Sequence, residues 1–91
     1  MAHRLDVLDL HNSGPTDGVE DDTLWLAELR EADGHHEQFR FSLASRYGQP
    51  TANEMREMIR RYAAGLSIAE LHEREEPHGE DPYRRVIFLR P

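Results

Sequence analysis

One long stretch of the chain, residues 49–76, has apolar positions at the spacing of an amphipathic helix. These positions would form a single apolar stripe: Ala52, Met55, Met58, Ile59, Tyr62 and Ala63. Thr51 with Glu54 has the sequence of a capping box, and Gly65 suits the left-handed residue that ends a helix. The pattern therefore predicts a helix over residues 51–64.

A second, shorter helix is predicted directly after the first. Ser67 with Glu70 repeats the capping-box sequence, so this helix would begin at Ile68 and run to about Glu75. Pro77 would stop it, because proline has no backbone N–H and clashes with the preceding turn of a helix.

The remaining apolar residues follow the patterns of short strands, which are expected at 3–10, 23–32, 35–45 and 83–90. The order along the chain is then β-β-β-α-α-β. We expect one α+β domain over residues 1–91, in which the main helix packs on one face of an antiparallel sheet of about four strands. Loops are predicted where acidic and turn-forming residues collect, at 12–22 and 77–82.

The second and third strands are predicted to form a hairpin around Asp33-Gly34, with two alternative registers. A two-residue turn would pair Leu24 with Leu43 and place Trp25 on the opposite sheet face. An exposed Trp25 would then be a candidate anchor for a partner protein. A three-residue loop with Gly34 in a bulge would instead pair Trp25 with Leu43. We favour the bulged register, because it collects the large aromatic side chains on one face.

Charge is distributed unevenly along the chain. The first 45 residues carry 3 Arg and 10 acidic residues, whereas the remaining residues carry 8 of each, so the formal charge of −7 belongs to the N-terminal half. Such a field repels phosphate backbones and favours cationic partners. Glu20, Asp21 and Asp22 are therefore the candidate contact for a basic patch on another protein.

Composition removes several classes of function. The chain has no Cys, which excludes disulfides and thiolate chemistry, and its 6 glycines are too scattered for a phosphate-binding loop. We therefore expect no cofactor. No apolar run approaches the roughly 20 residues that span a bilayer, and no signal-peptide pattern begins the chain, so we expect a cytoplasmic protein without membrane contact.

The nearest approach to a metal site is the pair His72 and His78, with Glu73, Glu75 and Glu76 between them. Two imidazoles and a carboxylate are the ligands of many catalytic zinc sites. This cluster makes a small metal-dependent enzyme one alternative, although the chain lacks the i, i+4 histidine pair on a helix that zinc hydrolases use.

The segment 59–71 resembles the first half of helix-turn-helix DNA-binding domains, in which a turn containing Gly precedes a short helix of Ile-Ala-Glu-Leu type. The resemblance covers 13 residues and implies a DNA-binding regulator as a further alternative. In that family the next helix contacts the bases. Here the matching residues, 75–82, are acidic and contain Pro and Gly, so no recognition helix is predicted and nucleic-acid binding is not expected.

These observations favour a small non-catalytic module that acts through protein–protein contact, for example as an inhibitor, an immunity-type protein or a regulatory partner. Its acidic half would face a basic partner. A sheet edge left open by short strands would also permit a homodimer with a continuous sheet.

Overall fold

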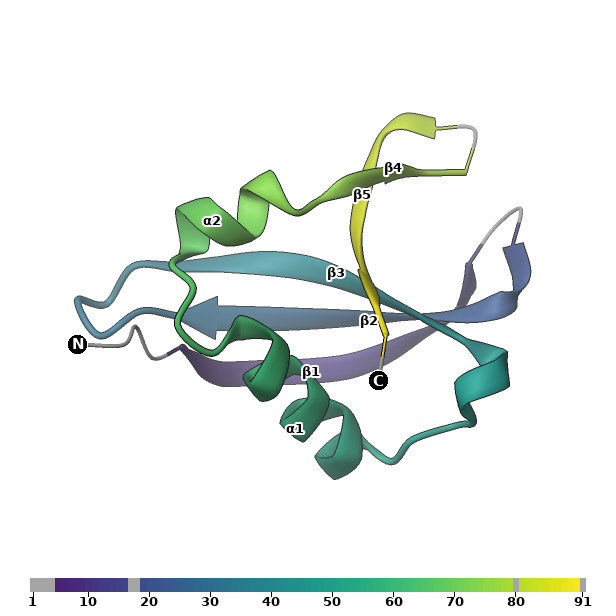
Figure 1. Cartoon of the computed structure of the whole chain (residues 1–91), viewed down its shortest axis with the longest axis horizontal. Helices are drawn as coiled ribbons and strands as arrows, with labels where there is room; N and C mark the ends of the chain where they lie inside the picture. The colour runs from purple at the N-terminus through teal and green to yellow at the C-terminus, as the bar shows by residue number, and fades with distance from the viewer. Residues whose placement is uncertain (1–4, 17–18, 80, 91) are drawn as a thin grey trace.

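The computed structural model describes residues 5–16, 19–79 and 81–90, and the side chains of residues 14–22 and 81 lie outside this description. The chain forms an α+β fold with one mixed sheet (Figure 1). Its elements in chain order are β1 (Asp6–Thr16), β2 (Val19–Arg30), β3 (His36–Ala44), the 3₁₀ turn η1 (Ser45–Tyr47), α1 (Ala52–Ala63), α2 (Ile68–Glu73), β4 (Glu76–His78) and β5 (Asp81–Leu89).

The sheet has five strands in the order β1-β2-β3-β5-β4, so the expectation of about four antiparallel strands is only roughly right. The pairs β1–β2, β2–β3 and β4–β5 are antiparallel, but β3 and β5 are parallel. The reason is the connection between them: a parallel pair needs a long crossover, and α1 and α2 supply it. The fifth strand, β4, forms where the sequence predicted the start of a loop, because its backbone pairs with β5.

The predicted acidic loop over residues 12–22 is wrong. β1 extends to Thr16 and β2 begins at Val19, so most of this stretch belongs to a long hairpin. Pairing between the two strands shifts register at three points. Such bulges accommodate turn-forming residues such as Gly14 and Pro15. β1 also lies at the edge of the sheet, where one side of the strand has no hydrogen-bonding neighbour and a proline is tolerated.

The homodimer expected from an open sheet edge stays a prediction. β1 has a single neighbouring strand along its 11 residues and is the longer of the two sheet edges. Its three register shifts disfavour regular pairing with a further strand, because a bulge bends the edge and interrupts the ladder of hydrogen bonds.

The hairpin between β2 and β3 has the expected three-residue loop, with Gly34 at φ 96°. The amide of Gly34 donates to Glu31 O (2.9 Å), and the amide of Glu31 donates to His35 O (2.8 Å). Trp25 pairs with Phe41, so neither predicted register forms: the partners are shifted by two residues from the bulged register and by one from the register of the two-residue turn. The expected face is nevertheless correct, because a shift of two residues preserves the side-chain alternation.

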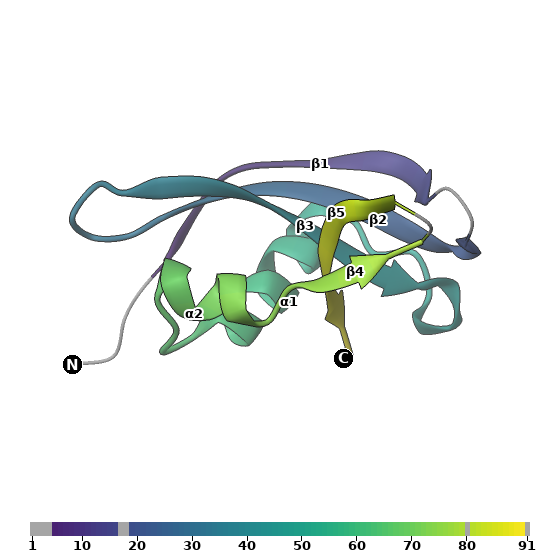
Figure 2. The same cartoon turned by 90° about the horizontal axis from the view of Figure 1, so that it is seen from above.

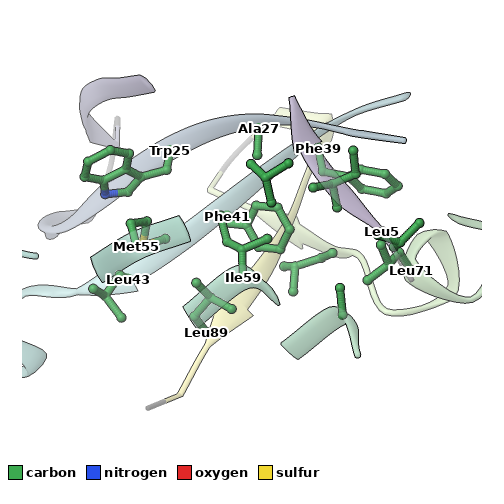
Figure 3. Packing of buried hydrophobic residues seen from close by; sticks show 14 of the residues in the cluster. Leu5, Trp25, Ala27, Phe39, Phe41, Leu43, Met55, Ile59, Leu71 and Leu89 are labelled. Atoms are coloured by element: carbon green, nitrogen blue, oxygen red, sulfur yellow. The ribbon is translucent and has the colours of Figure 1, made fainter. Parts of the chain in front are cut away.

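The core lies between the sheet and the two helices, which both cover the same face (Figure 2). Met55 and Ile59 of α1 and Leu71 of α2 are fully buried against Phe39 and Phe41 of β3 (Figure 3). The main helix packs on one face of the sheet, as predicted.

Local and long-range hydrogen bonds fix the two helices in place. Both predicted capping boxes form, at Thr51 with Glu54 and at Ser67 with Glu70. In addition, the carboxylate of Glu31 accepts a bond from the amide of Ile68 (2.7 Å), so the β2–β3 loop caps α2 from a distance. Arg56 Nη1 donates to Val7 O (2.9 Å), a second long-range bond that connects α1 to β1.

Candidate functional site

All four residues proposed as partner contacts lie on β2, but Trp25 is buried there. Glu20, Asp21 and Asp22 belong to the first part of β2, where Asp22 pairs with Ala44, and their side chains lie outside the described part of the chain. Trp25 is 5% exposed and belongs to the core cluster. The tight turn that would have exposed Trp25 is not formed, so Trp25 is not available as a surface anchor.

His72 and His78 are not brought together. His72 lies on α2 with its ring against Phe39, on the sheet face that the helices cover (centroid distance 4.7 Å). His78 lies on β4, is 4% exposed and packs against Phe88 (5.3 Å). Because Ile87 points into the core, its strand neighbour Phe88 points to the other face. The two imidazoles therefore lie on opposite faces of the sheet, and within the described residues no group of three or more His, Asp or Glu side chains could hold a metal ion.

His72 is instead the centre of a hydrogen-bonded clamp between α2 and β3. Its Nδ1 lies 2.6 Å from Glu75 Oε1 and its Nε2 lies 2.8 Å from Glu37 Oε1, while the other Glu37 oxygen lies 2.9 Å from His35 Nε2. Only the protonated imidazole can donate from both nitrogens. The bonds to Glu75 and then Glu37 raise the pKa of His72 above its ordinary 6.5, although partial burial opposes them, and the bonds from His72 and then His35 lower the pKa of Glu37 below 4.5.

This clamp predicts a pH-dependent stability. The contribution of His72 is complete below pH 6.5 and is lost as pH rises through the raised pKa, whereas that of Glu37 is complete above pH 4.5 and is lost as pH falls through the lowered pKa. The difference in free energy of unfolding between the native protein and His72→Gln should therefore peak between pH 4.5 and 6.5. The side chains of His72 and Glu37 are 40% and 38% exposed, so water screens their interaction. The largest difference in free energy of unfolding should therefore be about 1 kcal/mol or less.

Urea unfolding of both proteins at several pH values measures this difference. His11→Gln is the matched control, since His11 lies exposed on β1 and makes no ion pair with any described residue. A difference that keeps growing above pH 8 would show that His72 stabilises the fold in its neutral form.

The segment that resembles half of a helix-turn-helix does form a helix pair, α1 and α2. The chain then continues into β4 and β5, where a helix-turn-helix domain would have its recognition helix. In the described residues, 75–79 and 81–82, no helix forms, as predicted. Gly65, at φ 80°, provides the turn between the two helices.

A furrow follows the solvent side of α1 and was not expected from the sequence. It consists of three adjoining depressions of about 600, 250 and 330 Å³. The first and second share Met58 and Arg61, and the second and third share Tyr62 and Arg90. Together these adjoining depressions form the furrow, which extends from Tyr47 of η1, along α1, to the end of β5.

The apolar part of this furrow comes from residues at the margin of the core. Met58 and Tyr62 lie one helical turn apart, are partly buried and pack against the core cluster. Tyr47 is 39% exposed at one end, with the Arg46 guanidinium over its ring at 4.9 Å. Leu89 closes the middle depression from β5. The sequence contained a signal for this surface. The apolar stripe of α1 has more residues than the three that are buried, Met55, Ile59 and Ala63, so some apolar side chains had to remain at the margin of the core.

No protein-family model, no curated protein and no solved structure matches this chain. In the described residues no helix is both long and apolar enough to cross a membrane. The arrangement of its own residues is therefore the basis on which a function is proposed.

Proposed function

We propose that the protein is a small non-catalytic module that binds another protein, and that the furrow along α1 receives an extended segment of that partner. The observation that carries the proposal is that three depressions adjoin through shared lining residues, with Tyr47, Met58 and Tyr62 among the residues that line them. Grooves lined by aromatic and methionine side chains are typical of peptide recognition, because these residues supply large contact areas and adapt to a ligand.

The size of the furrow suits a short segment. Along α1 it extends from Asn53 to Tyr62, which at 1.5 Å per residue corresponds to about 14 Å. An extended peptide of four residues covers about 13 Å. A partner segment of this length would cover the part of the furrow that lies along α1.

The acidic group Glu20, Asp21 and Asp22 remains our proposal for such a further contact, with a basic patch on the partner. Support comes from the distribution of charge, since the N-terminal half of the chain carries the entire net charge of −7. Reversal of these three charges to Lys should weaken partner binding and reduce its dependence on salt.

Selection of peptides from a random dodecapeptide display library on the purified protein tests the furrow. We expect enriched peptides to bind the native protein and to lose at least about tenfold in affinity on Asn53→Trp, since a Trp at this exposed position would occupy the depression with the largest volume of the three. Ala69→Trp is the matched control, because it adds the same side chain to an exposed position of α2 away from the furrow.

If no peptide is enriched, or if Asn53→Trp and Ala69→Trp bind equally well, the furrow is not a peptide-binding site. Measurement of thermal unfolding for both variants confirms that each is folded, so that loss of binding reports on the furrow.

A further inference from the structure

The charge of the furrow changes along its length. The middle depression is lined by two arginines, Arg61 and Arg90, around an apolar floor of Met58, Tyr62 and Leu89. The first depression adds Glu54 and Glu57 to the shared Arg61, and the third adds Glu76 to the shared Arg90. The centre of the furrow is therefore cationic in a protein whose net charge is −7.

Several arginines of the chain are engaged by neighbouring groups. Arg60, the neighbour of Arg61 on α1, is paired with Glu57 (2.8 Å), and Arg30 is paired with Asp6 (3.6 Å). Arg85 donates to Glu75 O (2.8 Å). Within the part of the chain that the structure describes, the guanidinium groups of Arg61 and Arg90 make no ion pair and no hydrogen bond. Toward the described residues both keep their donors open to a ligand, as do Arg40 and Arg74 outside the furrow, but Arg61 and Arg90 are the pair that lines an apolar depression.

A guanidinium that lines an apolar pocket favours a carboxylate, because its donors match the two carboxylate oxygens and form charge-assisted bonds. The middle depression, of about 250 Å³, also offers apolar surface beside these donors. A ligand with an apolar side chain next to a carboxylate would bind both the guanidinium donors and the apolar surface. In the first depression two glutamates outnumber the single arginine and disfavour a further carboxylate, since like charges across an interface repel.

From this arrangement we infer that the partner segment carries an Asp or Glu beside a bulky apolar residue, with the carboxylate bound by Arg61 and Arg90 and the apolar side chain on Met58, Tyr62 and Leu89. The inference rests on the proposed function, and it specifies which class of peptide the furrow selects. Binding in the middle of the furrow depends on one carboxylate, whereas the acidic N-terminal half of the chain serves a separate, basic contact.

The test uses three pools of labelled octapeptides that differ in their central dipeptide, Asp-Leu, Asn-Leu or Asp-Ser, and are random elsewhere. We expect the full chain to bind the Asp-Leu pool about tenfold better than the Asn-Leu pool, the factor that one charge-assisted hydrogen bond supplies. The Asp-Ser pool should also bind less well, because it leaves the apolar floor uncovered. Higher salt should reduce the preference for Asp over Asn.

Two double variants separate local recognition from overall charge. Arg61→Gln with Arg90→Gln should make the Asp-Leu and Asn-Leu pools equivalent. Arg40→Gln with Arg74→Gln removes the same charge from exposed positions outside the furrow and should retain the preference. All four positions are exposed, so each variant is expected to fold.

The outcomes distinguish the inference from the proposed function. Binding that requires an open furrow but shows no preference for Asp would leave the function in place and overturn the inference. A preference for Asp that survives Arg61→Gln with Arg90→Gln would also overturn it, because the carboxylate would then be recognised elsewhere. If no pool binds and the random library yields no peptide, both proposals are wrong.

Discussion

Replacement of Phe41 by Ala should lower the free energy of unfolding by about 3–5 kcal/mol, the largest effect we expect from a single substitution. Phe41 is 0% exposed and lies on β3, the middle strand of the sheet, between Trp25 of β2 and Ile87 of β5. Its ring also meets the ring of Tyr62 of α1 edge-on (6.5 Å). Truncation would leave a cavity, because the closely packed neighbours on β2, β5 and α1 cannot all move inward to fill it.

Urea unfolding monitored by circular dichroism measures this loss. Phe41→Leu, which keeps most of the volume, should cost less than Phe41→Ala. Arg40→Ala, at the exposed position next to it on β3, should change stability by about 0.5 kcal/mol or less. A cost for Phe41→Ala as small as that for Arg40→Ala would contradict the packing between the sheet and α1.

Ile59→Ala is the second large effect, with an expected loss of about 2–5 kcal/mol. Ile59 is 0% exposed, and it lies at the middle of the buried face of α1 between Met55 and Ala63. Figure 3 shows Ile59 on the side of the helix that faces Phe41. The substitution removes contacts between helix and sheet while preserving helix propensity, because alanine is the best helix former.

A graded pair of variants tests this interpretation. Ile59→Val should cost about 0.5–1.5 kcal/mol, since it removes one methyl group from the same site. The combination of Ile59→Ala with Phe41→Ala should differ from the sum of the two single effects, because residues that share a packing site are coupled. Additive losses would place the two side chains in separate parts of the core.

The fold class was readable from the sequence because its signals are local. The capping boxes at Thr51 and Ser67 and the turn at Gly34 involve residues three or four positions apart, and all are present in the structure. The alternation in β3 identified the buried face that contains Phe39 and Phe41. Such patterns depend on hydrogen bonds and burial within one or two elements.

The errors share a different origin. The parallel pairing of β3 with β5 depends on how α1 and α2 cross the sheet, and no local pattern describes that path. The strand pairing of residues 12–16 and 19–22 was missed because pairing between the backbones of β1 and β2, rather than the composition of the stretch, determines its conformation. Likewise, His72 and His78 are near in sequence, but the turn into β4 places them on opposite faces of the sheet.

The sequence by itself determined the helices with their caps, the hairpin turn, the buried faces and the concentration of acidic charge in the N-terminal half. Tertiary structure alone decided the sheet order, the strand register and the furrow, because each is formed by residues far apart in the chain. Tyr47, Met58, Tyr62 and Leu89 carry no common motif, and they become one surface only when η1, α1 and β5 pack together. The same is true of Arg61 and Arg90, whose shared position beside an apolar pocket is the basis of the proposed recognition of a carboxylate.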